Sequence, residues 1–156
     1  MGIQIRKAKS QDVPAMTSVS HAADAAFVPL IGRPPAPMVA DHAAHIRDDT
    51  VWVACEDAGM VIGYAIVIEA EDGFWLDNIA VDPSAQGQGV GSRLLSAVEA
   101  WLASRTDRYA LYTNIKMTAN IGWYRRLGFV ETGRRHVDGF DRVYFEKQLA
   151  PPAGGG

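Results

Sequence analysis

A glycine-rich segment near the middle of the chain has the composition of a phosphate-binding turn. Residues 82–93 read Asp-Pro-Ser-Ala-Gln-Gly-Gln-Gly-Val-Gly-Ser-Arg, between a strand-like apolar run and an amphipathic helical pattern. Its glycines, Gly87, Gly89 and Gly91, let the backbone turn tightly and come close to a ligand. The first N–H groups of a helix have no partner within it and carry the positive end of its dipole. The segment therefore predicts a binding site for a pyrophosphate group.

Other phosphate motifs fit this turn poorly. A Walker A loop needs Lys-Ser/Thr after its last glycine, and Gly91 is followed by Ser92-Arg93. A dinucleotide-binding fold places its glycines after the first strand, whereas about four predicted strands come before this turn. Taken alone, the glycines can also serve only a tight strand-to-helix connection.

Two further motifs follow the turn in the chain. The turn itself contains Gln86-x-x-Gly89-x-Gly91, and residues 120–129 read Asn-Ile-Gly-Trp-Tyr-Arg-Arg-Leu-Gly-Phe. A hairpin signal, Asp138-Gly139, comes last. In this order the three elements resemble the GCN5-related N-acetyltransferase (GNAT) superfamily, over residues 1–149. The resemblance implies an α/β (α+β) fold, with a mixed, mostly antiparallel sheet of about seven strands, about four helices and splayed central strands.

The resemblance implies that acetyl-CoA binds at the turn and along the strand before it, with no metal. The backbone of Ile79 and Val81 would pair with the pantetheine arm. Many members also carry an asparagine where this chain has Met117, and Asn120 or Asn114 would substitute for it. The pyrophosphate would be held by the amides of Gln86, Gly87, Gln88, Gly89, Val90, Gly91 and Ser92.

The resemblance also implies direct attack of an amine on the thioester within a ternary complex. A backbone N–H near Ile79 would polarise the thioester carbonyl. Tyr124 would lie near the sulfur of CoA and donate a proton to it as general acid. The alternative for Tyr124 is a packing aromatic beside Trp123, although adjacent helical residues point in different directions.

The sequence defines the general base less well. Family members place an acid early in the strand before the turn or in the following strand, but this chain has Trp75 and residues 111–114, Leu-Tyr-Thr-Asn, at those places. Asp77 lies two residues after Trp75, so a regular strand would place both on one face. We expect Asp77 to be the leading candidate. Glu69 and Glu71 are weaker candidates, because carboxylates at a strand end or turn are usually solvated.

Other polar residues bear on the acceptor and on metal binding. The first helix and the loop after it border the acceptor site in the resembled family, and they carry His21, Asp24, Phe27 and Arg33. Asp41, His42 and His45 lie close together but lack an obvious third metal ligand, so we expect the histidines to be exposed or to face the substrate. The doublets Arg125-Arg126 and Arg134-Arg135 could meet a CoA phosphate or simply lie on the surface.

Composition limits the class of protein. The chain has 156 residues, 48% hydrophobic and 21% charged, which suits one domain over residues 1–149 with a disordered tail at 150–156. A net charge of −3 favours neither nucleic acid nor an anionic membrane. One cysteine, Cys55, excludes an internal disulfide framework. No signal peptide or membrane-spanning run is recognisable, so we expect a cytoplasmic protein.

Hydrophobic periodicity predicts the elements that position these residues. Strands are expected at residues 3–5, 51–56, 60–69, 74–81, 109–114, 129–137 and 140–149. Helices are expected from residue 10 or 12 to about 27, over 37–47, around 94–102 and over 118–127, with irregular chain at 29–37.

Two functions fit this pattern. The first is an acetyl-CoA-dependent N-acetyltransferase acting on a small-molecule or peptide amine, and the resemblance leaves a homodimer open. The second is a CoA-binding sensor that keeps the fold without turnover. The absence of an acid at both usual base positions favours the sensor, whereas Tyr124 favours the enzyme, because binding alone needs no proton donor.

Overall fold

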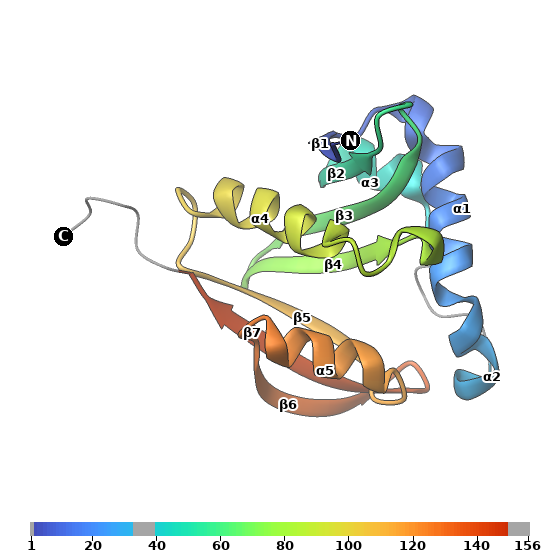
Figure 1. Ribbon diagram of the computed structural model, residues 1–156. Helices are drawn as coiled ribbons and strands as arrows, with labels where there is room; N and C mark the ends of the chain where they lie inside the picture. The colour runs from blue at the N-terminus through green and yellow to red at the C-terminus, as the bar shows by residue number, and fades with distance from the viewer. Residues whose placement is uncertain (1, 33–39, 150–156) are drawn as a thin grey trace.

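The strands form one seven-stranded sheet in the computed structural model, which describes residues 2–32 and 40–149 (Figure 1). Their order across the sheet is β1-β2-β3-β4-β5-β7-β6, and only β4 and β5 run parallel. The strands are β1 (Gln4–Lys7), β2 (Thr50–Cys55), β3 (Val61–Ala70), β4 (Gly73–Val81), β5 (Arg108–Asn114), β6 (Val130–Val137) and β7 (Phe140–Gln148). The predicted mixed, mostly antiparallel sheet is confirmed.

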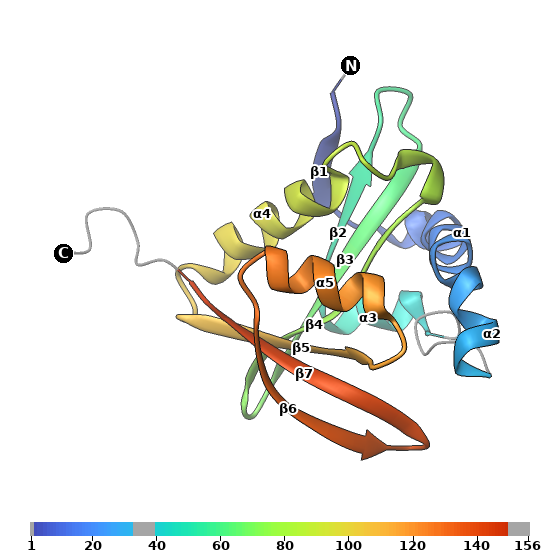
Figure 2. The ribbon, with the colours of Figure 1, turned by 60° about the horizontal axis from the view of Figure 1, so that its bottom comes forward.

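Helices cover both faces of this sheet (Figure 2). The helices are α1 (Val13–Asp24), α2 (Val28–Ile31), α3 (His42–Asp48), α4 (Val90–Leu102) and α5 (Thr118–Arg126). The first core cluster joins α4 and α5 to one face, and the second joins α1 and α3 to the other. Within the described residues four helices exceed a single turn, as predicted.

Helix α4 shows why the sequence pattern gives this packing. Leu94, Leu95, Val98 and Leu102 recur at helical spacing, and all four are buried against the sheet. Burying each such side chain stabilises the fold by roughly 1.5–3 kcal/mol. The helix therefore holds its N-terminal end, where the glycine-rich turn lies, in a fixed place on the sheet.

Strands β4 and β5 meet at one point and then separate. They pair only at Trp75 and Ala110, whereas β4 pairs with β3 over most of its length and β5 pairs with β7 over seven residues. The Trp75 ring lies edge-on to Tyr112 and Tyr144 at this junction. Beyond this pair the two parallel strands no longer pair within the described residues and their C-terminal ends diverge, so the predicted splay is confirmed (Figure 1).

The region after α1 differs from the prediction. A 3₁₀ turn, Ala25–Phe27, leads into α2, so residues 29–31 are helical rather than irregular. Proline is tolerated there because the first-turn N–H groups have no helical partner. Gly32, at φ 86°, ends α2 in the left-handed conformation.

The second predicted helix begins later than residue 37. Ala40 and Asp41 are not helical, and the Asp41 carboxylate caps α3 by accepting a hydrogen bond from the Ala44 amide at 3.0 Å. The other predictions for residues 33–39 and for the tail at 150–156 lie outside the described residues. No described helix is both long and apolar enough to span a membrane.

Candidate active site

Asp77 lies at a β-bulge in β4, on the face of the sheet opposite its neighbour Leu76. Ile66 of β3 pairs with Asn78 and Val67 pairs with Leu76, so Asp77 has no partner across the ladder. Leu76 and Ile79 pack into the core beneath α4, while Asp77 faces His45 of α3. Alternation along β4 from Trp75 and Leu76 already places Asp77 on the α3 side of the sheet, on the same face as Trp75, as predicted.

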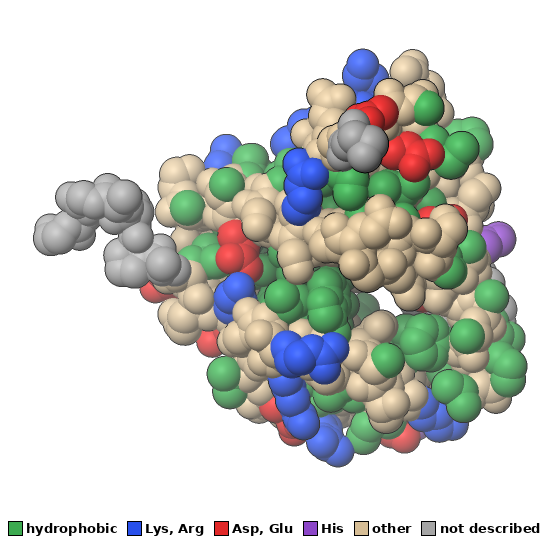
Figure 3. All heavy atoms as spheres, in the orientation of Figure 1, with side chains coloured by type: hydrophobic (Ala, Val, Ile, Leu, Met, Phe, Trp, Pro, Cys, Tyr) green, Lys and Arg blue, Asp and Glu red, His purple; other side chains and the backbone are tan. Residues whose placement is uncertain are grey.

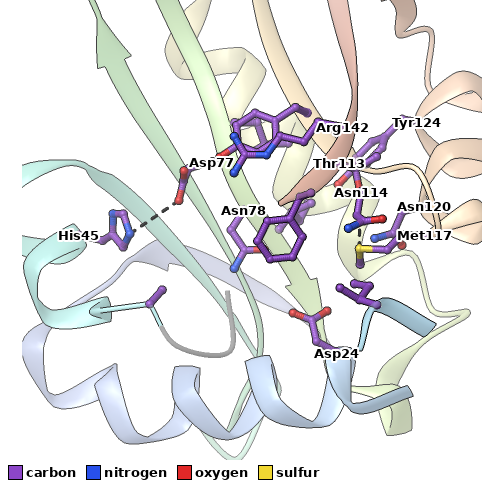
Figure 4. Close-up of a pocket in the computed structure, with 16 residues that line it drawn as sticks. Asp24, His45, Asp77, Asn78, Thr113, Asn114, Met117, Asn120, Tyr124 and Arg142 are labelled. Carbon is purple, nitrogen blue, oxygen red and sulfur yellow. Dashed lines mark hydrogen bonds and ion pairs between the residues drawn. The ribbon is translucent and has the colours of Figure 1, made fainter. Parts of the chain in front are cut away.

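A pocket lies where β4 and β5 diverge, and we call it the splay pocket (Figure 4). It is lined by residues 76–79 of β4 and 112–114 of β5, with side chains from α1, α3, α5 and β7, and its volume is about 280 Å³. Tyr124 and Asp77 both line it. The two residues predicted to be catalytic are therefore brought to one pocket, from elements far apart in the sequence.

Tyr124 combines a packed ring with an available hydroxyl. Its ring contacts Phe129 and Phe145 at centroid distances of 5.7 and 6.3 Å, and its side chain is buried. No described residue hydrogen-bonds to the hydroxyl. Burial raises the pKa of Tyr124, and the nearby Asp24 charge raises it further. The phenol therefore keeps its proton at neutral pH and is a donor facing the pocket.

Asp77 lies in a less polar setting than an ordinary surface carboxylate. Burial raises its pKa, the positive charge of a protonated His45 would lower it, and the negative charge of Asp49 raises it. The other candidate bases, Glu69 and Glu71, are exposed at the end of the β3–β4 hairpin and do not line the splay pocket. Asp77 is thus the better placed of the three.

His45 is a site residue that sequence reasoning did not connect to Asp77. Its Nδ1 lies 2.8 Å from Oδ2 of Asp49. Its Nε2 lies 3.7 Å from Oδ2 of Asp77, the contact drawn as a dashed line in Figure 4. His45 lines the splay pocket, but His42 is buried beside Tyr64, so the prediction that the histidines are exposed or substrate-facing is wrong for His42. Among the described residues no three potential ligands are grouped to hold a metal ion.

A second, larger pocket lies over the glycine-rich turn, and we call it the turn pocket. Its volume is about 740 Å³, and the surface is hollowed between this turn and α5 (Figure 3). Every residue predicted to bind the cofactor lines it except Gln88, which is exposed in the turn: Ile79, Val81, Gln86, Gly87, Gly89, Val90, Gly91, Ser92 and Asn120.

The geometry of the turn explains two of its glycines. Gly89 caps α4 with φ 76°, a left-handed conformation that other residues rarely adopt. At Gly91 a Cβ atom would lie 2.8 Å from the Trp123 ring, closer than real Cβ contacts. Glycine at these positions exposes the first N–H groups of α4 to the turn pocket.

The splay and turn pockets adjoin each other. Asp24, Ile79 and Asn120 line both of them. Burial raises the pKa of Asp24 to about 6. Met117 and Asn114 line only the splay pocket, so Asn120 is the better placed of the two asparagines predicted to substitute for the family's residue.

Of the other residues predicted to lie near the acceptor or the CoA phosphates, some line a pocket and others do not. Phe27 lines the turn pocket, His21 is exposed and lines neither pocket, and Arg33 lies outside the described residues. Arg126 lines the turn pocket. Arg125 and Arg134 instead pair with Glu131, at 3.0 and 3.1 Å, on the surface.

The edge of β4 that faces β5 lacks a strand partner beyond Trp75, within the described residues. Unpaired backbone N–H and C=O groups on such an edge can accept an extended ligand as if it were an added strand. This edge runs past Ile79 to Val81 and reaches both pockets.

Comparison with known proteins identifies the fold. The acetyltransferase (GNAT) domain family matches residues 47–131, more than half of the chain. The peptidyl-lysine N-acetyltransferase YjaB of Salmonella typhimurium is 29% identical over 94 residues, which cover 60% of this chain and 59% of that protein.

Two further comparisons extend over more of the chain. The aminoglycoside N(6′)-acetyltransferase type 1 of Stenotrophomonas maltophilia is 31% identical over 116 residues, which cover 68% of this chain and 71% of that protein. The crystal structure of the PaiA N-acetyltransferase of Thermoplasma acidophilum, in complex with coenzyme A, matches with a TM-score of 0.78 at 18% identity, over 96% of this chain and all of that one. The chain belongs to the GNAT acetyltransferase family.

Proposed function

We propose that this protein transfers the acetyl group of acetyl-CoA to a primary amine, by direct attack in a ternary complex. The observation that carries the proposal is the junction of the two pockets on the unpaired edge of β4, at Ile79. A thioester reaching this junction from the turn pocket would meet an amine that occupies the splay pocket. The coenzyme A bound to the related PaiA structure supports the same donor here.

The residues of the turn pocket fit a CoA molecule. The first N–H groups of α4, opened by Gly89 and Gly91, suit a pyrophosphate. The unpaired β4 edge from Ile79 to Val81 suits the amides of a pantetheine arm. Arg126 adds a cation to the pocket, and Asn120 offers an amide at the junction.

Asp77 would accept a proton from the bound ammonium. An amine with a pKa near 10.4 costs about 4.6 kcal/mol to deprotonate at pH 7, so a positioned base matters. Burial raises the pKa of Asp77, which brings it closer to the pKa of the amine. Asp77 would also bind the acceptor's positive charge before it reacts.

Tyr124 would donate its proton as the carbon–sulfur bond breaks. On ordinary pKa values a phenol is a weaker acid than a thiol by roughly 1.5 units, about 2 kcal/mol. Complete proton transfer before bond breaking is therefore unfavourable, and the hydroxyl acts best as a hydrogen-bond donor to the charge developing on sulfur. No described residue hydrogen-bonds to the Tyr124 hydroxyl, so the hydroxyl is free to contact the sulfur.

The splay pocket favours a cationic acceptor of modest size. Asp24 and Asp77 both line a volume of about 280 Å³, close to the lower end of small-molecule sites. Such a space suits an amine-bearing side chain or one end of a polyamine. One relative is a peptidyl-lysine N-acetyltransferase and another is an aminoglycoside N-acetyltransferase, which supports an amine acceptor here.

The test is release of the CoA thiol from acetyl-CoA by the wild-type protein, with a lysine-containing peptide, kanamycin and spermidine as probes. Isothermal titration with acetyl-CoA runs in parallel. The proposal predicts binding of acetyl-CoA and thiol release that depends on one of the amines. Binding without release for every probe would favour a CoA-binding sensor, and absence of binding would overturn both.

A further inference from the structure

Three side chains form a line from the splay pocket toward the end of α3. Asp77 lines the pocket, His45 faces it from α3, and Asp49 follows the last residue of that helix. The side chains of Asp77, His45 and Asp49 are 28%, 20% and 19% exposed, so solvent reaches the line at both ends. An acceptor bound in the splay pocket would cover the Asp77 end, which leaves the other end as the exit for a proton. Asp77 comes from β4 and the other two residues from the end of α3, which packs on the face of the sheet where Asp77 lies.

The contact with Asp49 assigns the ring nitrogens of His45. An ionised carboxylate only accepts hydrogen bonds, so Nδ1 at 2.8 Å from Asp49 carries the proton. In the neutral ring Nε2 is then an acceptor, and it faces Asp77. The same i, i+4 contact holds the ring in place at the end of a short helix.

We propose that Asp77, His45 and Asp49 form a proton relay, which carries the proton lost by the acceptor amine out of the splay pocket. The inference deepens the proposed function and rests on it. Neither His45 nor Asp49 is needed to bind acetyl-CoA, because neither lines the turn pocket.

The proton can be followed through the three groups. An N–H bond of the ammonium breaks as an O–H bond forms on Asp77. That proton then passes to Nε2 of His45, which regenerates the carboxylate and leaves an imidazolium. Asp49 accepts the Nδ1–H hydrogen bond and balances the new charge, and the imidazolium releases one proton to solvent.

The distance between Asp77 and His45 suits a transient contact. At 3.7 Å the two atoms are too far apart for a direct hydrogen bond but within ion-pair range. The terminal torsion of a carboxylate is soft, so a modest rotation of Asp77 brings its oxygen within reach of Nε2. In the resting arrangement both atoms can accept hydrogen bonds from one ammonium group.

Other charged and titratable groups also surround Asp77 within the described residues. They are Asp24 on α1, Tyr64 on β3, Tyr112 on β5, Tyr124 on α5 and Arg142 on β7. Arg142 lies over the Tyr112 ring, at 4.3 Å from its centroid. The two variants described next leave all five of these groups unchanged.

The test compares His45→Gln and Asp49→Asn with the wild type, using acetyl-CoA and the lysine-containing peptide, kanamycin or spermidine. Glutamine preserves polar contacts but carries no proton between neighbours. We expect His45→Gln to lower kcat at least about tenfold, as for loss of a proton-transfer group, with acetyl-CoA affinity unchanged. In the His45→Gln background Asp49→Asn should cause no further loss, because both act in one path.

The pH profile separates a relay from a structural role. When His45 is protonated, its positive charge lowers the pKa of Asp77, and the negative charge of Asp49 raises it. Because Asp77 must be ionised to accept a proton, the acid limb of kcat/KM should move to higher pH in His45→Gln and to lower pH in Asp49→Asn. A disturbed fold would instead move the acid limbs of the two variants in the same direction.

The hairpin formed by β6 and β7 provides a matched control. His136 also lies 2.8 Å from an aspartate, Asp141, but both are exposed and neither lines a pocket. His136→Gln should leave kcat and its pH profile unchanged. Should His45→Gln unfold, His45→Ala with added imidazole provides a second assay, since restored turnover supports proton transfer.

The outcomes are distinct. Loss of kcat in His45→Gln, with opposite shifts of the acid limbs, supports the relay. Wild-type turnover by His45→Gln, or equal losses in His45→Gln and His136→Gln, would overturn it and leave the proposed function standing. No thiol release by the wild type with any of the three amines would overturn the proposed function, and the relay with it.

Discussion

Gly91 lies directly against the Trp123 ring, so that the backbone at the start of α4 contacts a side chain of α5. A Cβ atom added at Gly91 would lie 2.8 and 3.0 Å from two atoms of that ring. The contact ties the glycine-rich turn to the helix that carries Tyr124, the residue after Trp123.

Gly91→Ala is therefore expected to destabilise the protein. Alanine favours a helix over glycine by about 1 kcal/mol, but overpacking against an aromatic ring typically costs roughly 1–3 kcal/mol. We expect the steric effect to exceed the helix preference, with a lower Tm and weaker acetyl-CoA binding, measured by calorimetry.

A double-mutant cycle with Trp123→Leu checks the cause. If the Trp123 ring is the obstacle, Gly91→Ala should cost little or even stabilise the protein in the Trp123→Leu background. An equal loss in both backgrounds would show that the ring is not responsible.

Arg126 and Arg125 are adjacent but should behave differently. Arg126 lines the turn pocket, whereas Arg125 pairs with Glu131 on the surface. Arg126→Ala should weaken acetyl-CoA binding about three- to tenfold, with the loss reduced at high salt, because the screened charge contributes less. Arg125→Ala is the matched control and should leave the Kd unchanged. Equal effects of the two substitutions would contradict a phosphate contact by Arg126.

Asp24 should make stability depend on pH. Its pKa, about 6 in the folded protein because of burial, lies above that of an unfolded aspartate near 3.9. The folded state therefore binds more protons between these values, and stability falls as pH rises from about 4 to 6. Above pH 6 the charged carboxylate destabilises the fold, by about 1–3 kcal/mol.

Asp24→Asn should remove this pH dependence. We expect the variant to unfold at a higher denaturant concentration than the wild type at pH 7, and at a similar concentration at pH 4. Because Asp24 lines both pockets, the same substitution should raise KM for a cationic acceptor. A wild-type stability that is flat between pH 4 and 6 would contradict the burial of an ionisable Asp24.

The turn and the hairpins were accessible from the sequence because their signals are local. Gly89 needs a left-handed conformation that few residues adopt, and Asp138-Gly139 forms a turn with positive φ at both residues. The amphipathic pattern of α4 likewise follows from spacing alone. Asp77 could be placed on the strand before the turn and on the face of Trp75 from alternation, although the bulge beside it depends on pairing with β3.

The rest of the site depends on contacts between distant segments. His45 reaches Asp77 only because α3 packs on the face of the sheet where Asp77 lies. No pattern near His45 indicates that contact, whereas its pairing with Asp49 has helical i, i+4 spacing and could have been recognised. The helical turn at Pro29 was missed because proline stops a helix only beyond its first turn.

Tyr124→Phe tests the central claim most directly, through CoA thiol release with the amine that the wild type accepts. The account predicts a fall in kcat of at least about tenfold with acetyl-CoA affinity intact, because only the hydroxyl is removed. Tyr144→Phe, which removes a phenol outside both pockets, should leave kcat unchanged. Wild-type kcat in Tyr124→Phe would contradict the assignment of Tyr124 as the proton donor.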